Sequence, residues 1–174
     1  MLSPSHVNGR TSLKQGCPYC NTRGTSYQEQ FIYHSLKQIY PSAENRCRVL
    51  KSIQNHQGVE FDIGVSEIPL CIEYSSTYWR REERDQYKEE LCEQCGVRLI
   101  QIIDDSYNEL EHITSDDYIC FKMNYSQQDE ILEIIVDHIL KSLGHSISEI
   151  DIELVKQKAY ESSKGIEKDI QDTD

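Results

Sequence analysis

Four cysteines form two identically spaced pairs, Cys17-Pro-Tyr-Cys20 and Cys92-Glu-Gln-Cys95. Tetrahedral zinc is bound by four thiolates at about 2.3 Å, and each C-x2-C turn can supply two of them. We therefore predict one structural Zn²⁺ ion held by all four cysteines, with His6 as a substitute ligand. A redox pair is the alternative for Cys17 and Cys20. The residues around this pair predict neither the preceding strand nor the following long helix that such a pair needs.

The formal net charge of -12 is unevenly distributed. Residues 1–103 contain 12 Lys/Arg and 12 Asp/Glu, whereas residues 104–174 contain 6 and 18. Proteins that bind duplex DNA normally present a basic face that displaces counterions from phosphates. The charge balance therefore argues against broad non-specific DNA binding, although it allows a local basic patch in the neutral half.

The 174 residues are enough for one domain with an appendage. No stretch approaches 18 consecutive apolar residues, and the first ten residues lack the apolar core of a signal peptide. We expect a soluble, cytoplasmic protein without a membrane partner, located in the host cytoplasm if a phage encodes it. In that reducing compartment, paired cysteines favour metal or redox chemistry over disulfides.

Apolar periodicity and turn residues predict the elements that must position any site. We expect helices over residues 26–40, 82–95 and 126–143, and strands over residues 46–53, 59–65, 69–74, 97–103 and 118–122. This order predicts an α/β fold with a mixed sheet and helices on both faces. We divide the chain into a zinc-binding segment (1–24), a core (25–144) and an acidic tail (145–174), for which we expect partial order followed by disorder.

Several segments of the chain resemble the PD-(D/E)XK, or restriction-endonuclease-like, superfamily. Residues 17–144 are similar to phage-type, very-short-patch-repair-like endonucleases, in which a CPYC zinc-ribbon half precedes the nuclease core. The matching segments are, in order, Ser26-Tyr-Gln-Glu29, Glu60-Phe-Asp62, Ile72-Glu-Tyr74, Tyr78-Trp79, Asp85-x-x-Lys88 and Gly96-Val-Arg-Leu-Ile100. The resemblance implies a restriction-endonuclease-like mixed sheet flanked by helices.

The resemblance also implies a catalytic site. Adjacent strands would bring Asp62 and Glu73 to one edge, where their oxygens hold Mg²⁺ or Mn²⁺. Such an ion polarises the scissile phosphate and helps to form hydroxide from water. Glu29 would bind the ion or its water, and Lys88 would stabilise the phosphate or orient the nucleophile.

The chain departs from these relatives at two places. Ser75 and Ser76 follow the metal-binding glutamate, where the superfamily has a lysine and the subgroup often has Asp-Gly. Arg80 stands where the subgroup typically has a histidine. Two expected catalytic contributions are therefore missing, and the site is either rearranged or inactive.

Each of these residues also has an ordinary structural explanation. Glu29 completes a capping box with Ser26, and Asp62 is explained as a solvated strand residue. Lys88 is explained as one half of a surface ion pair with Asp85. Glu73 is less easily explained, because a carboxylate in an apolar strand needs a partner or a metal.

Two functions from different classes remain. The first is a nuclease-derived, zinc-binding protein with a degraded active site that inhibits a nucleic-acid-processing machine, plausibly an anti-CRISPR inhibitor of a CRISPR effector nuclease. The second is an active Mg²⁺-dependent DNA endonuclease of the phage or homing type. Arg80 and Arg84 form a basic stripe with Lys88 on the predicted helix, which could contact a partner protein or phosphates.

Overall fold

The computed structural model describes residues 25–50, 59–76, 82–105 and 115–171. In chain order, the helices and strands are α2 (Tyr27–Ile39), β1 (Ala43–Leu50), β2 (Val59–Val65), β3 (Leu70–Ser76), α3 (Glu82–Cys95), β4 (Arg98–Asp104), β5 (Tyr118–Phe121), α4 (Gln128–Ser142) and α5 (Ile152–Gln171). Two 3-10 turns, Tyr125–Gln127 and Ile147–Glu149, precede α4 and α5.

The five strands form one mixed sheet in the order β1-β2-β3-β4-β5. β2 pairs antiparallel with both β1 and β3, whereas β3, β4 and β5 run parallel. The predicted α/β fold with a mixed sheet is therefore confirmed, and β2 and α3 have the bounds expected from the sequence. The first strand begins three residues earlier than expected, at Ala43.

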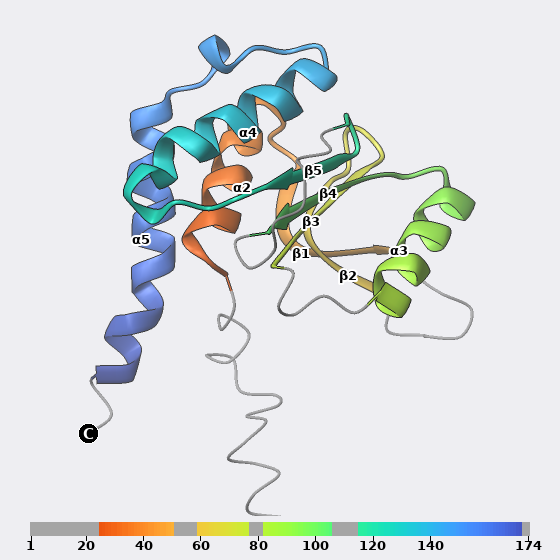
Figure 1. Ribbon diagram of the computed structural model, residues 1–174, viewed down its shortest axis with the longest axis horizontal. Coiled ribbons are helices and arrows are strands. Elements are labelled where there is room, and N and C mark those ends of the chain that lie inside the picture. The colour runs from red at the N-terminus through yellow and green to blue at the C-terminus, as the bar shows by residue number, and fades with distance from the viewer. Residues whose placement is uncertain (1–24, 51–58, 77–81, 106–114, 172–174) are drawn as a thin grey trace, which may run out of the picture.

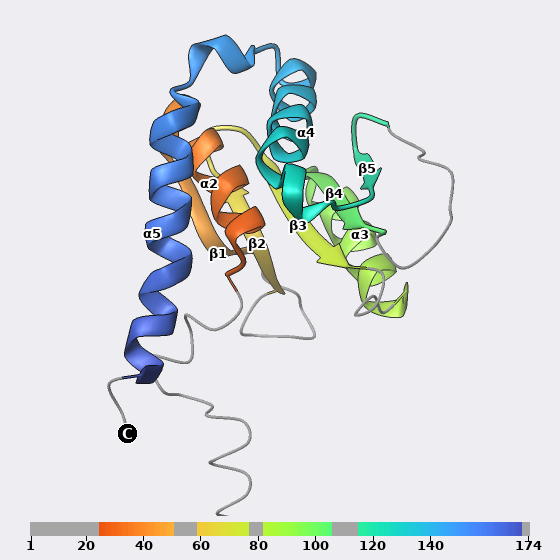
Figure 2. The same cartoon turned by 60° about the vertical axis from the view of Figure 1, so that its left-hand side comes forward.

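Helices cover both faces of the sheet. Figures 1 and 2 show α3 on one face, α2 and α4 on the other, and α5 as an outer layer against α2. The larger apolar cluster joins α2, α4 and α5 to their face of the sheet, with Phe31, Ile72 and Leu132 among its buried members. A smaller cluster under α3 contains Phe61, Cys71, Leu91 and Cys92.

Local signals fix the ends of the helices near the candidate site. Ser26 caps α2, and the predicted capping box is present because Ser26 and Glu29 exchange backbone-to-side-chain hydrogen bonds of 3.2 Å. Gly96 adopts φ 66° after α3, and Gly144 adopts φ 84° after α4. This left-handed conformation suits glycine and ends both helices where the sequence predicts.

The C-terminal segment, for which the sequence predicts partial order followed by disorder, is helical as far as Gln171. It forms α5, whose residues Val155 and Ala159 are buried against α2. Gln38 anchors the start of the segment by a 2.8 Å hydrogen bond from Asp151 N and a 3.1 Å bond to Asp151 O. The small side chain of Ala159 completes an apolar stripe on α5 that becomes visible only when the helix lies against α2.

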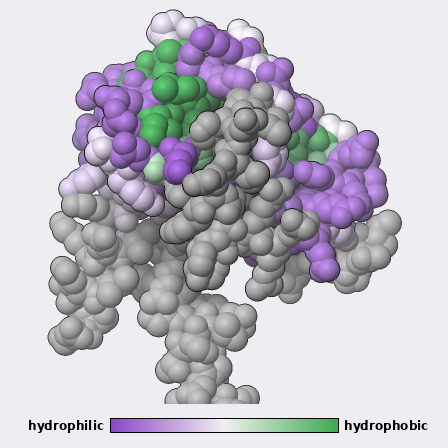
Figure 3. Space-filling view, in the orientation of Figure 1, coloured by the Kyte–Doolittle hydropathy of each residue, from purple (hydrophilic) through white to green (hydrophobic). Residues whose placement is uncertain are grey.

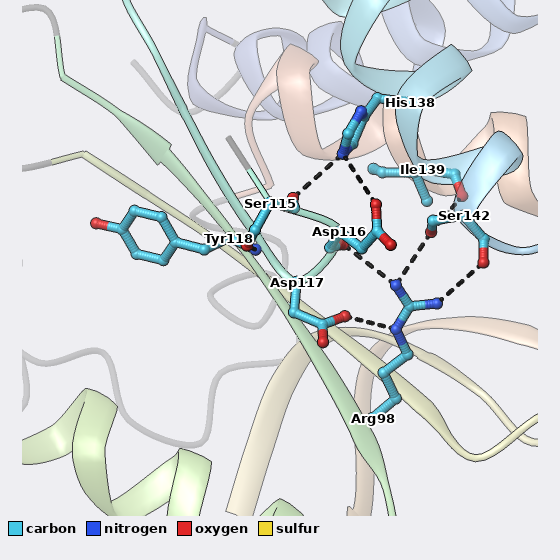
Figure 4. Close-up of polar contacts among 8 residues, drawn as sticks. All are labelled: Arg98, Ser115, Asp116, Asp117, Tyr118, His138, Ile139 and Ser142. Carbon is cyan, nitrogen blue, oxygen red and sulfur yellow. Dashed lines mark hydrogen bonds and ion pairs between the residues drawn. The ribbon is translucent and has the colours of Figure 1, made fainter. Parts of the chain in front are cut away.

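Arg98 connects three parts of the fold on the α4 side of β4 (Figure 4). Its Nε donates to Asp117 Oδ1 at 2.6 Å, and its Nη2 donates to Asp116 O at 3.2 Å. The same guanidinium donates to Ser142 O and Ser142 Oγ at the end of α4. His138 Nε2 lies 3.1 Å from Ser115 O in the same network. One side chain thus links β4, the entry to β5 and the last turn of α4.

In the part of the chain that the structure describes, no helix has the length and apolar character needed to cross a membrane.

Candidate functional site

Three predicted site residues, Asp62, Glu73 and Lys88, come together where β2 pairs with β3, and the fourth, Glu29 of α2, is close enough for its charge to interact with those of Asp62 and Glu73. The Ile63–Ile72 pair joins β2 to β3. Asp62 directly precedes Ile63 and Glu73 directly follows Ile72, so the antiparallel register places these two residues opposite each other. Asp62 is close enough to Glu29 and Glu73 to raise the pKa of both carboxyl groups. Strands that are adjacent in the sheet therefore position the two central carboxylates, as the resemblance to nucleases implies.

Lys88 of α3 forms an ion pair with Glu73 beneath the helix. Its side chain is only 4% exposed, and Nζ lies 5.0 Å from the centre of the Phe61 ring. A buried lysine needs a compensating charge, and Glu73 provides it. The alternative interpretation of Lys88 as half of a surface ion pair is therefore wrong.

Burial and like charge raise the pKa of Glu73 to about 7, and the neighbouring Lys88 limits the increase. Burial also raises the pKa of Asp62, although a 2.8 Å hydrogen bond from Tyr74 N to Asp62 Oδ2 and the charge of Lys88 oppose this shift. Asp62 is thus half-buried and hydrogen-bonded, unlike an ordinary solvated strand residue. The two carboxylates repel each other and are stabilised by cations.

Glu29 combines a structural and an electrostatic role. Its Oε2 accepts the capping hydrogen bond from Ser26 N. Burial and the nearby charge of Asp62 raise its pKa to about 8. A carboxyl group with this pKa exchanges a proton close to neutral pH, which is the property required of a general acid or base.

Two arginines add positive charge around the carboxylates. Arg84 is exposed one turn before Lys88, and its charge lowers the pKa of Asp62 and Glu73. Arg46 lies on β1 between the Asn45–Ile63 and Cys47–Phe61 pairs, which places it opposite Asp62. Its φ of 52° is disfavoured for a side chain of this size. No local sequence pattern indicates Arg46, because only the pairing of β1 with β2 brings it to the site.

Among the described residues, no three His, Cys, Asp or Glu side chains form a group that could hold a metal ion. Mg²⁺, however, is usually held by one or two carboxylates, with water and substrate phosphates as its other ligands. Asp62 and Glu73 fit that pattern. Gln101, which no sequence motif indicates, adds a buried oxygen on the strand next to Glu73, and this oxygen has no hydrogen-bond donor among the described residues.

The second cysteine pair does not have one shared environment. Cys92 is 1% exposed and packs in the cluster under α3, where its thiol is hydrogen-bonded to that of Cys71. Cys95 is exposed at the end of the same helix. Cys17 and Cys20 lie outside the described residues, so the four-cysteine zinc site stays a prediction. Cys47, Cys71 and Cys120 are buried, as expected for small core residues.

The residues that depart from the family pattern lie partly within the described chain. Ser75 and Ser76 end β3, where they pair with Ile103 and Asp104 of the parallel strand β4. Arg80 lies outside the described residues, together with Tyr78 and Trp79. No protein-family model, curated protein or solved structure matches the chain.

Proposed function

We propose that the protein is a divalent-metal-dependent DNA endonuclease in which Asp62 and Glu73 hold the cation. The observation that carries this proposal is that Asp62 and Glu73 lie together beside the buried ammonium group of Lys88, with Glu29 close enough for its charge to interact with both carboxylates. Buried charges are costly, and a solvated or purely structural role for these residues would not require three carboxylates to share one location. The resemblance of the chain to PD-(D/E)XK endonucleases supports the same conclusion.

The residues can divide the work of phosphodiester hydrolysis. A bound Mg²⁺ or Mn²⁺ ion would polarise the phosphate and lower the pKa of a water molecule. Lys88 supplies a fixed positive charge beside Glu73, suited to stabilising the charge of a phosphate. Glu29 can take up or release a proton at its carboxyl group close to neutral pH. Arg84, which is exposed, is available to contact the DNA backbone.

A second candidate function is the binding and inhibition of a nucleic-acid-processing machine such as a CRISPR effector nuclease. Ser75 and Ser76 favour it, because serine replaces charged groups expected after Glu73. The acidic C-terminal half also suits a basic nucleic-acid groove.

The C-terminal half also carries an apolar surface that could contact a partner. A pocket of about 330 Å³ lies between β5 and α4 and is lined by Phe121, Ile131 and Ile135 among others. Ile134 of α4 is 70% exposed, and an apolar patch is visible over this helix in Figure 3.

Cleavage of supercoiled plasmid DNA in Mg²⁺ and in Mn²⁺ tests the first proposal. We expect nicked or linear DNA with the full chain and at least a hundredfold loss with Glu73→Gln. The matched control is Glu60→Gln on β2. This substitution changes an exposed carboxylate that forms an ion pair with Arg48. Absence of cleavage with both metals, together with tight binding to a CRISPR effector, would contradict the endonuclease proposal and support the inhibitor function.

A further inference from the structure

Gln101 continues the polar row of the candidate site onto β4. The parallel register of β3 and β4 places Gln101 directly beside Glu73. On the other side of Glu73, the antiparallel register of β2 and β3 places Asp62 opposite Glu73. Three neighbouring strands thus contribute Asp62, Glu73 and Gln101 at the same level of the sheet, where facing side chains are about 5 Å apart.

The side chain of Gln101 lies on the α3 face, because residues alternate along a strand. One register step away, Cys71 pairs with Leu99, and both pack in the cluster under α3. Ile100 and Ile102, which flank Gln101 in the sequence, belong to the larger cluster on the opposite face. Gln101 therefore shares its face with Glu73, whose partner Lys88 lies on α3.

Gln101 is an exception within an apolar strand. Its neighbours from Leu99 to Ile103 are all leucine or isoleucine. The Gln101 side chain is 6% exposed, and its Oε1 has no hydrogen-bond donor among the described residues. A buried carbonyl oxygen without a donor destabilises the folded protein. Such an atom in a native core points to a water molecule or an ion.

We propose that Gln101 Oε1 is the third protein oxygen of the divalent-cation site, beside the carboxylates of Asp62 and Glu73. Side-chain amide oxygens are ordinary ligands of hard cations such as Mg²⁺ and Mn²⁺. The amide adds an oxygen without adding to the repulsion between the two carboxylates. This inference rests on the proposed function, because it concerns the same cation.

Direct measurement of Mn²⁺ binding to the full chain tests this role. The variants are Gln101→Met, which removes the oxygen at similar volume, and Gln101→Glu, which replaces the amide with a carboxylate. The matched control is Gln94→Met, an exposed glutamine of α3. We expect Gln101→Met to weaken Mn²⁺ binding at least about tenfold, and Gln101→Glu to strengthen it. Gln94→Met should bind like the unchanged protein.

Thermal unfolding in EDTA separates ligand loss from misfolding. Gln101→Met should unfold at the same or a higher temperature than the unchanged protein, because it removes an unsatisfied buried oxygen. If Glu73→Gln abolishes Mn²⁺ binding but neither substitution of Gln101 changes it, the inference about Gln101 is overturned and the proposed function is not. Absence of Mn²⁺ binding to the unchanged protein would overturn it together with the proposed function. Normal Mn²⁺ binding and Gln101 effects without DNA cleavage would support this inference and contradict only the endonuclease proposal.

Discussion

Lys88 donates from its buried ammonium group to the carboxylate of Glu73, and this pair joins α3 to the middle of the sheet. Neither residue has another described charge partner as closely placed. Asp62 raises the pKa of Glu73, whereas Lys88 lowers it, so the pair lies in a field of opposing charges.

Loss of Lys88 should destabilise the fold. We expect Lys88→Met to lower the free energy of unfolding by about 3 kcal/mol at pH 8, because it leaves the buried carboxyl group of Glu73 without a counter-charge. The double variant Glu73→Gln/Lys88→Met should lose less than Lys88→Met alone. Urea unfolding of the three proteins measures this coupling. Lys141→Met is the control, because its partner Asp137 lies on an exposed helix surface and the expected loss is below about 1 kcal/mol. Additive losses in the double variant would mean that the pair is not coupled.

Removal of Lys88 should strengthen cation binding, although it weakens the fold. Lys88→Met leaves Asp62 and Glu73 with less positive charge nearby, so we expect Mn²⁺ to bind about tenfold more tightly. DNA cleavage should nevertheless fall, because the fixed charge beside the phosphate is lost. Isothermal titration and plasmid cleavage measure the two effects. Arg84→Met should change Mn²⁺ binding less, since Arg84 is exposed. Weaker Mn²⁺ binding in Lys88→Met would contradict competition between the ammonium group and the cation.

Features encoded by adjacent residues were predictable from the sequence. The Ser26–Glu29 capping box, the turn at Gly96 and the bounds of α3 depend on spacings of a few residues. The convergence of Asp62, Glu73 and Lys88 also agrees with the prediction, which relied on the resemblance to a nuclease family. Strand alternation alone would have left Asp62 on a solvated face.

Features that depend on strand register were not predictable. Gln101 reads as one polar residue in an apolar strand, and only its pairing with Glu73 relates it to the site. Arg46 reaches Asp62 through the antiparallel pairing of β1 and β2. In the same way, Ala159 contributes to the core only because α2 lies against α5. Each of these relationships joins residues that a local pattern cannot connect.

The raised pKa of Glu29 predicts a pH-dependent gain in stability for Glu29→Gln. The folded pKa is about 8, above the ordinary value of 4.5, so the folded protein keeps a proton that the unfolded chain has lost. Stability therefore falls as pH rises from about 4.5 to 8, and the full cost remains above pH 8. Glutamine avoids this cost and can still accept from Ser26 N. We expect a gain on the order of 2 kcal/mol at pH 8.5 and none at pH 4.

Melting temperatures across this pH range measure the effect of Glu29→Gln. The matched control is Glu44→Gln, which changes an exposed carboxylate of β1. A Glu29→Gln protein that gains no stability between pH 5 and pH 8.5 would show that Glu29 ionises at its ordinary pKa.

Arg98 should contribute more to stability than other arginines of the surface. Arg98→Met removes hydrogen bonds to Asp117, Asp116 and Ser142, and leaves the last turn of α4 without this donor. We expect a loss of about 2–3 kcal/mol, and a smaller loss for Arg98→Lys, which keeps the charge but not the planar fork. Arg48→Met is the control, because its pair with Glu60 is exposed and is worth less than about 1 kcal/mol. Equal losses at the two positions would contradict the linking role of Arg98.

The predicted zinc site can be tested through the different environments of its cysteines. Zinc analysis of the purified protein should give about one ion per chain, and Cys17→Ser should lose it. Cys120→Ser is the control, because Cys120 lies on β5 and is not a predicted ligand. Cys92 would have to give up its hydrogen bond with Cys71 to bind zinc, whereas Cys95 is already exposed. Cys95→Ser should therefore lose zinc with little effect on the core, while Cys92→Ser should also lower stability. Full zinc occupancy in a protein carrying both substitutions would exclude this pair as ligands and leave His6 as the remaining candidate beside Cys17 and Cys20.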